Sequence, residues 1–177
     1  MRIISGKYKG RIISPPKNFK ARPTTDRARE SLFNILSNTI DFDKINVLDL
    51  FSGTGSVGFE FASRGAKYVE MIELNFKHFK HLKDTIKLMS IDNIKVIRAD
   101  FFHYIRKKKN SFDIVFADPP FDMENFETVP ELILNSNLLS KNGLLIIEHS
   151  KSFNFKTIEG FTEQRNYGGV NFSFFNK

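Results

Sequence analysis

From residue 45 onward the sequence alternates short apolar runs with longer amphipathic stretches, and this alternation restricts the possible folds more than any other feature. The apolar runs are rich in aliphatic and β-branched residues, and they predict strands at 45–50, 68–73, 94–98, 112–117 and 143–148. The stretches between them predict helices at about 56–64, 75–89, 101–108 and 125–135. Strands that alternate with helices predict an α/β fold with a parallel sheet covered on both faces.

The two ends of the chain follow other patterns. At the C-terminus, two alternating runs surround Gly168-Gly169 in EQRNYGGVNFSFF, which predicts an antiparallel hairpin at one edge of the sheet. At the N-terminus, isoleucines and basic residues alternate around Gly6 and Gly10, which predicts a short β-hairpin. The segment RPTTDRARESLFNILSN predicts a helix that Thr24, Thr25 or Asp26 caps. We therefore expect an N-terminal hairpin arm over residues 1–22 and one domain over residues 23–177.

Composition excludes several classes of protein. The 177 residues include no cysteine, which excludes disulfides, thiolate metal sites and thiol nucleophiles. The chain begins with a charged segment and has no apolar run long enough to cross a membrane, so we expect a soluble, cytoplasmic protein and a monomer. No His, Asp and Glu cluster has metal-ligand spacing. His78 and His81 lie on a lysine-rich helix, and we expect them to be solvated.

The positive charge is concentrated near the N-terminus. Residues 1–30 contain nine Lys or Arg side chains against two acidic ones, which accounts for the whole net charge of +7. We expect the exposed face of the helix that follows to carry Arg22, Arg27 and Arg29. A structured basic ribbon suits a polyanion such as a phosphate backbone, and we expect Lys7, Lys9 and Arg11 to contact it. The alternative is a solvated charged tail without a partner.

Acidic residues and glycines follow the predicted strands. Asp49 ends the first strand and is followed by Gly53-x-Gly55-x-x-Gly58, where glycines let the backbone turn tightly and approach a ligand. Glu73 ends the second strand and can accept the hydroxyls of a ribose. Asp100 ends the third and can meet an adenine amino group. Since ligands bind at the carboxyl ends of such strands, this pattern predicts an adenosine-type cofactor. The glycines leave NAD(H) and S-adenosylmethionine as alternatives.

The fourth strand ends in Asp118-Pro119-Pro120-Phe121, which suits a planar exocyclic amine. An amine conjugated to a nucleobase must turn its lone pair out of plane before it can attack a methyl sulfonium. Acceptors at the Asp118 carboxylate and the Pro119 carbonyl would favour that geometry, and Phe121 would stack on the base. Methylation at C5 of a pyrimidine generally needs a thiolate, which this chain lacks. The alternative interpretation is an ordinary turn after a buried strand.

Several segments together resemble the RsmD family of bacterial 16S rRNA guanine-N2 methyltransferases. They are MRIISGKYKGR, RPTTDRARESLFNIL, LDLFSGTGSVGFE, DIVFADPPF, GLLIIEHSK and RNYGGVNFSFF. The resemblance implies a Rossmann-like methyltransferase domain over residues 23–177 with a mostly parallel seven-stranded sheet. It also implies S-adenosylmethionine as the donor and a guanine of 16S rRNA, free or in the small ribosomal subunit, as the acceptor. Two departures from the family pattern are Ser52-Gly53-Thr54-Gly55 in the loop and Phe121 where tyrosine is commoner.

The resemblance also assigns roles to residues. Those that should line the cofactor site are Asp49, Phe51, Gly53, Gly55, Glu73, Leu74, Asp100 and Phe101. Those that should hold the base are Asp118, Pro119, Pro120 and Phe121. Those that should close over the site and touch RNA are Arg22, Thr24, Thr25, Asp26 and Arg27. The segment from Thr24 to Asp26 has the alternative of acting only as a helix cap.

Three other functions compete with this interpretation. An adenine-N6 methyltransferase acting on DNA or RNA would share the Asp118-Pro119-Pro120-Phe121 motif. An NAD-dependent oxidoreductase would need a proton donor that this motif does not offer. A non-catalytic RNA-binding module would need only the basic arm and would leave the glycine loop unexplained.

Overall fold

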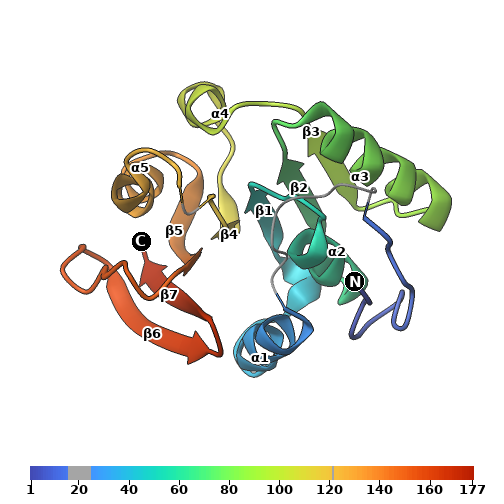
Figure 1. The fold of residues 1–177 in the computed structure, drawn as a ribbon, viewed down its shortest axis with the longest axis horizontal. Helices are drawn as coiled ribbons and strands as arrows, with labels where there is room; N and C mark the ends of the chain where they lie inside the picture. The colour runs from blue at the N-terminus through green and yellow to red at the C-terminus, as the bar shows by residue number, and fades with distance from the viewer. Residues whose placement is uncertain (16–24, 121) are drawn as a thin grey trace.

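The computed structural model describes residues 1–15, 25–120 and 122–177, and within them seven strands form one sheet (Figure 1). The strands are β1 (Asn46–Leu50), β2 (Tyr68–Ile72), β3 (Ile94–Ile97), β4 (Phe112–Ala117), β5 (Leu139–His149), β6 (Phe161–Tyr167) and β7 (Val170–Asn176). Their order across the sheet is β3-β2-β1-β4-β5-β7-β6. The first five are parallel, and β7 pairs antiparallel with both β5 and β6. The seven-stranded sheet and its C-terminal hairpin are thus confirmed.

Helices connect the parallel strands at the predicted places. The α-helices are α1 (Asp26–Ser37), α2 (Ser56–Ser63), α3 (Phe76–Met89), α4 (Phe101–Lys107) and α5 (Val129–Leu134). The stretch predicted as one helix at 125–135 is a 3₁₀ turn, η2 (Phe126–Thr128), that leads into α5, and a further turn, η1 (Phe42–Lys44), precedes β1. Asn125 has a positive φ of 58°, so a right-handed helix cannot begin at this residue as predicted. None of the helices in the described ranges is long and apolar enough to cross a membrane.

The strand order places a reversal between β1 and β4. From β1 the chain builds outward through β2 and β3, then returns to the centre and builds the other half from β4. Leu50 pairs with both Ile72 and Ala117, so β1, β2 and β4 end at the same level. Ligands of open α/β sheets bind at this reversal, outside the carboxyl ends of the strands.

Strand β5 is longer than the sequence predicts. It begins at Leu139, four residues before the expected start at 143, and its register against β4 shifts between Phe112 and Ile114. The polar residues Ser140, Lys141 and Asn142 interrupt the apolar pattern, and the irregular pairing accommodates them. This explains why an apolar run alone underestimates the strand.

The N-terminal hairpin forms, but it is short and lies against the domain. Arg2 and Ile12 form an antiparallel bridge, flanked by a hydrogen bond from Ile3 N to Arg11 O of 3.0 Å. Ile3, Tyr8 and Ile13 are buried in the same core cluster as the strands. The division of the chain at residue 22 stays a prediction, because residues 16–24 lie outside the described ranges.

Helix α2 holds this hairpin through side chains at its C-terminal end. The buried Glu60 carboxylate accepts hydrogen bonds from Ile4 N (2.8 Å) and Ser5 N (3.0 Å), and it pairs with Arg64. The Ser63 hydroxyl accepts from Tyr8 N and donates to Ser5 O. All eight residues of α2 are buried, so the hairpin covers a helix that would otherwise expose apolar surface.

The start of α1 differs from the expectation in one respect. Thr25 is the N-cap, and its hydroxyl accepts a hydrogen bond from Ala28 N at 3.2 Å. Arg29, predicted on the exposed face, is only 1% exposed; it donates to Arg2 O at 2.6 Å and pairs with Asp26 at 2.9 Å. The expectation was wrong because Arg29 connects α1 to the hairpin, a tertiary contact that helical periodicity does not reveal.

Candidate functional site

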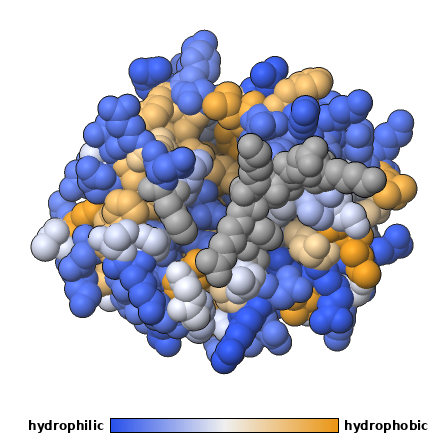
Figure 2. All heavy atoms as spheres, in the orientation of Figure 1, coloured by the Kyte–Doolittle hydropathy of each residue, from blue (hydrophilic) through white to orange (hydrophobic). Residues whose placement is uncertain are grey.

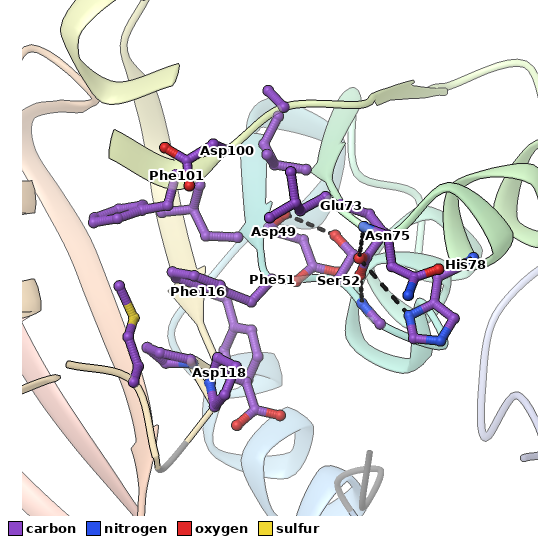
Figure 3. Close-up of a pocket in the computed structure, with 18 of the residues that line it drawn as sticks. Asp49, Phe51, Ser52, Glu73, Asn75, His78, Asp100, Phe101, Phe116 and Asp118 are labelled. Carbon is purple, nitrogen blue, oxygen red and sulfur yellow. Dashed lines mark hydrogen bonds and ion pairs between the residues drawn. The ribbon is translucent and has the colours of Figure 1, made fainter. Parts of the chain in front are cut away.

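A cavity of about 830 Å³ opens at the carboxyl ends of β1, β2 and β4, within the range of small-ligand sites. Figure 2 shows apolar residues around a recess in the upper part of this face, with charged and polar residues toward the rim. Figure 3 shows Asp49, Glu73, Asp100 and Asp118 reaching the cavity from different segments. The predicted acidic residues of four separate strand ends therefore meet at one place.

The end of β1 supplies a buried carboxylate and a strained turn. Asp49 is 2% exposed, and its Oδ2 accepts a hydrogen bond from Gly58 N at 3.0 Å. Burial raises the pKa of Asp49 to about 7, although the bonds to Gly58 and Ser52 lower it. Phe51 has a φ of 63°, which is rare for a bulky residue and typical of functional turns.

Glu73 connects the end of β2 to the glycine loop. Its Oε2 accepts from Gly53 N at 2.8 Å, and its Oε1 accepts from Asn75 N at 2.7 Å (Figure 3). The carboxylate is buried, yet it lines the cavity, and each oxygen retains a second lone pair for a ligand. It therefore fixes the loop and can accept hydroxyl hydrogen bonds at the same time.

Asp100 and Phe101 border the cavity at the start of α4. Asp100 is the N-cap, because its Oδ1 accepts a hydrogen bond from His103 N at 3.0 Å. The rings of Phe51 and Phe101 lie 5.1 Å apart at 37°, and Leu74 also lines the cavity. These apolar groups and a carboxylate acceptor suit a flat heterocycle that carries an amino group.

The Asp118-Pro119-Pro120 segment lies at the end of β4 and lines the same cavity. Asp118 N donates to Leu50 O at 3.4 Å, and Pro120 O accepts from Met123 N at 2.9 Å. Burial and the neighbouring Glu148 and Asp49 carboxylates raise the pKa of Asp118 well above its ordinary value. None of the described residues donates a hydrogen bond to the Pro119 carbonyl. Phe121, predicted to stack on the base, lies outside the described residues.

Gly55 does not line the cavity, in contrast to the other seven predicted cofactor residues. It has a φ of 77°, and a Cβ there would lie 2.6–2.7 Å from side-chain atoms of Leu82, Phe59 and Met71. The glycine is needed because the turn into α2 packs directly on the core. Similarly, a Cβ on Gly58 would lie 2.8 Å from Asp49 Oδ2. The second and third glycines of the motif thus permit close packing and do not face the cavity.

Among the residues predicted to contact RNA, those that the structure describes do not line the cavity. Lys7, Lys9 and Arg11 are exposed on the hairpin. Thr25 caps α1, Asp26 pairs with Arg29, and Arg27 is exposed. Arg22 and Thr24 lie outside the described residues. The capping role of Thr25 is therefore observed, whereas contact of these residues with RNA stays a prediction.

Sequence reasoning missed several cavity residues, and His78 is the most instructive. His78 lines the cavity, and its Nδ1 lies 3.7 Å from Glu73 Oε1. Both His78 and His81 are half-buried, so the expectation that they are solvated was wrong. The signal was the Asn75 cap, which places residue 78 in the first turn of α3, beside the strand end. Among the described residues, no group of three or more His, Cys, Asp or Glu could hold a metal ion.

Solved structures share this fold. The Escherichia coli protein yhhF superposes with a TM-score of 0.85 at 28% identity, over 100% of this chain and 97% of that chain. The 16S rRNA methyltransferase RsmC from Thermus thermophilus was solved with S-adenosylmethionine and guanosine. It superposes with a TM-score of 0.73 at 18% identity, over 90% of this chain and 45% of that chain. The chain thus shares the fold of these methyltransferases, one of which was solved with S-adenosylmethionine bound.

Sequence comparison gives the family. "Ribosomal RNA small subunit methyltransferase D" from Buchnera aphidicola is 39% identical over 154 residues, which cover 87% of this chain and 78% of that relative. The family model described as "Conserved hypothetical protein 95" matches residues 1–176. The chain therefore belongs to this family, the RsmD family of small-subunit rRNA methyltransferases.

Proposed function

We propose that this protein transfers a methyl group from S-adenosylmethionine to the exocyclic N2 amine of a guanine in 16S rRNA. The observation that carries the proposal is the position of Asp118 and Pro119 at the edge of the cofactor cavity. Rotation of a nucleobase out of its stack would bring a planar amine to this edge. The choice of guanine and of its N2 position comes from the family resemblance of the quoted motifs.

The cavity suits the cofactor in shape and in chemistry. Its volume of about 830 Å³ accommodates a nucleoside with an amino-acid tail. Glu73 would accept hydrogen bonds from ribose hydroxyls, Asp100 from an adenine amino group, and the Phe51 and Phe101 rings would contact the base. When bound, S-adenosylmethionine supplies an electrophilic methyl group on a positively charged sulfur.

The chain's own contribution to the chemistry is to hold the acceptor amine. Asp118 and the Pro119 carbonyl would each accept one N–H of the amine, which directs its lone pair toward the cofactor. The two prolines stiffen this segment and provide no backbone N–H that could compete. A carboxylate beside the nitrogen also stabilises the positive charge that develops on it and can accept the proton that leaves.

The test uses small-subunit rRNA, free and assembled, as substrate with S-adenosylmethionine. Nucleoside mass spectrometry should find N2-methylguanosine; N6-methyladenosine in its place would contradict the proposed acceptor. Asp118→Asn should lower the methylation rate about 10²–10³-fold, the usual cost of losing a preorganised electrostatic partner. The same variant should still bind S-adenosylhomocysteine, the uncharged product, as the wild type does. Full methylation by Asp118→Asn would show that another group holds the amine.

A further inference from the structure

An exposed aromatic ring and a guanidinium group lie together at the outer edge of the sheet. Phe76 begins α3 and is 56% exposed, and the Cζ atom of Arg98 lies 5.4 Å from the centre of its ring. Arg98 directly follows β3, which is an edge strand, and is also exposed. A single exposed apolar side chain is ordinary on a protein surface. An exposed ring together with an arginine is a combination that binds single-stranded nucleic acids.

Neighbouring groups hold this pair in place. Arg98 Nε donates a hydrogen bond to Leu74 O at 3.1 Å, and the side chain of Asn75 caps the first turn of α3, which fixes the backbone at Phe76. A guanidinium has five N–H donors. None of the other four on Arg98 has an acceptor among the residues that the structure describes. An arginine that is fixed in this way and keeps free donors is preorganised for a phosphate.

The charges around the pair are mainly positive. Lys77 and Lys80 lie in the first two turns of α3, are exposed and form no ion pair within the described ranges. Of the acidic side chains nearby in sequence, Glu73 is buried and Asp100 caps α4. Asp84 lies about two turns further along α3. This part of the surface therefore favours an anionic ligand.

The pair lies outside the cofactor cavity, although it is close to it. Neither Phe76 nor Arg98 lines the cavity, whereas Leu74 and Ala99, their near neighbours in sequence, do. A molecule that fills the cavity therefore does not need either side chain. The two side chains stay available for a second ligand.

The strand register gives the position of the pair relative to the acceptor site. Across β3, β2, β1 and β4, one row of paired residues consists of Ile97, Ile72, Leu50 and Ala117. Arg98 and Asp118 directly follow the two ends of this row. Three strand spacings, about 14 Å, therefore separate them along the carboxyl edge of the sheet. A single strand that places a base at Asp118 can reach Arg98 with a nearby nucleotide.

We propose that Phe76 and Arg98 form a nucleotide-binding subsite beside the cofactor cavity. A base of single-stranded RNA stacks on the exposed ring, and a phosphate of the same strand pairs with the guanidinium. The identity of the partner rests on the proposed function, because a methyltransferase that acts on rRNA has to hold the strand that flanks its target. The subsite binds this strand and takes no part in the transfer of the methyl group.

The two side chains should contribute to RNA affinity in different, measurable ways. Phe76→Ala removes the stacking surface and should weaken binding of small-subunit rRNA about tenfold, with no change in the slope of log K against log[salt]. Arg98→Gln removes one cation and should flatten that slope by about 0.7–0.9. Fluorescence titrations across a salt series, without cofactor, measure both effects. Wild-type affinity in Phe76→Ala, or a wild-type slope in Arg98→Gln, would overturn the proposal.

Leu88→Ala and Arg106→Gln are the matched controls. Leu88 is an exposed apolar side chain near the other end of α3, and Arg106 is an exposed arginine in the last turn of α4. Both variants should bind rRNA as the wild type does, and the same losses in these variants would contradict a specific subsite. Phe76→Ala should also keep its affinity for S-adenosylhomocysteine, because Phe76 does not line the cavity.

Kinetics separate this subsite from the chemistry of the proposed function. If Phe76 only binds the strand, Phe76→Ala should raise KM for rRNA about tenfold and leave kcat unchanged. A lower kcat at unchanged KM would contradict the subsite. Detection of N6-methyladenosine in place of N2-methylguanosine would refute the proposed acceptor, whereas the affinities would still report on the subsite. Normal formation of N2-methylguanosine together with wild-type rRNA affinity in Phe76→Ala would refute the subsite alone.

Discussion

Glu73 shows at the residue scale how one side chain can hold a loop in place while it also lines the cavity. Its two oxygens each accept a backbone N–H, from Gly53 and from Asn75. In Glu73→Gln the amide NH₂ must face one of these donors, so the loop should lose a hydrogen bond and the cofactor an acceptor. We expect S-adenosylhomocysteine to bind more weakly by about 1.5–3 kcal/mol, measured by calorimetry. Asp122→Asn, at the exposed rim of the same cavity, is the control and should bind nearly as the wild type.

Asp49 should make stability depend on pH in a direction opposite to that of most acids. Its pKa is about 7 in the folded protein against 3.8 as the ordinary value, so the folded state binds the extra proton between these limits. Stability from this group is therefore lost as the pH rises through that window. Asp49→Asn keeps an acceptor for Gly58 N and should be more stable than the wild type at pH 8, by roughly 2–4 kcal/mol. The two proteins should converge near pH 4 in urea unfolding; a variant less stable at pH 8 would contradict this.

At the scale of elements, the contact between the hairpin and α2 can be tested with a pair of glycines. Gly6 and Gly10 have nearly equal positive φ angles of 82° and 83°. A Cβ on Gly6 would lie 1.8 Å from Ser63 O, whereas a Cβ on Gly10 would meet nothing within 4 Å. Both alanine variants carry the strain of a positive φ, of the order of 1–2 kcal/mol. Only Gly6→Ala should also detach the hairpin from α2, because only its Cβ would collide with Ser63 O.

Hydrogen exchange and urea unfolding distinguish the two variants. In Gly6→Ala the amides of Ile4, Ser5, Lys7 and Tyr8, which bond to α2, should lose protection, and unfolding should require less urea than in Gly10→Ala. Equal protection in both variants would show that the contact with Ser63 contributes little to holding the hairpin.

The sequence predicted the elements well because their signals are local. Apolar periodicity located all five parallel strands, and Gly168-Gly169 located the C-terminal hairpin. It could not predict tertiary roles: Arg29 looks like a surface residue of an amphipathic helix, yet it is buried against the hairpin. Gly55 shows the same limit at the site, because a glycine that faces the core and one that faces a ligand are identical in sequence.

At the scale of the whole molecule, folding redistributes the charge. Over residues 31–177 basic and acidic side chains are equal in number, but Asp49, Glu60, Glu70, Glu73 and Glu148 are buried, and none of the Lys and Arg side chains in that range is. The surface of this part therefore exposes more basic than acidic side chains, although Glu60 and Glu70 pair with Arg64 and Lys108. The sequence count that places the net charge on residues 1–30 is unchanged. A basic surface beyond the hairpin also favours a polyanionic partner.

The contribution of the hairpin to RNA binding can be separated from this general effect. Replacing Lys7, Lys9 and Arg11 by Ala should flatten the slope of log K against log[salt] by roughly two to three units, if each side chain pairs with one phosphate. The matched control replaces Lys141, Lys151 and Lys156, three exposed lysines from β5 and the segments that follow it. Fluorescence titrations of small-subunit rRNA across a salt series measure both slopes. Equal slopes for the two triple variants would remove any special role of the hairpin.

Helix α2 joins the glycine loop at its start to the hairpin at its end, and it is buried along its whole length. A helix of eight residues spans about 12 Å, and close packing on every side prevents it from bending or extending. Helix α2 therefore fixes the distance between the hairpin and the cavity. An RNA that contacts the hairpin and also places a base in the cavity would have to span that distance. The modified nucleotide would then be selected by its distance, in the folded RNA, from the site that contacts the hairpin.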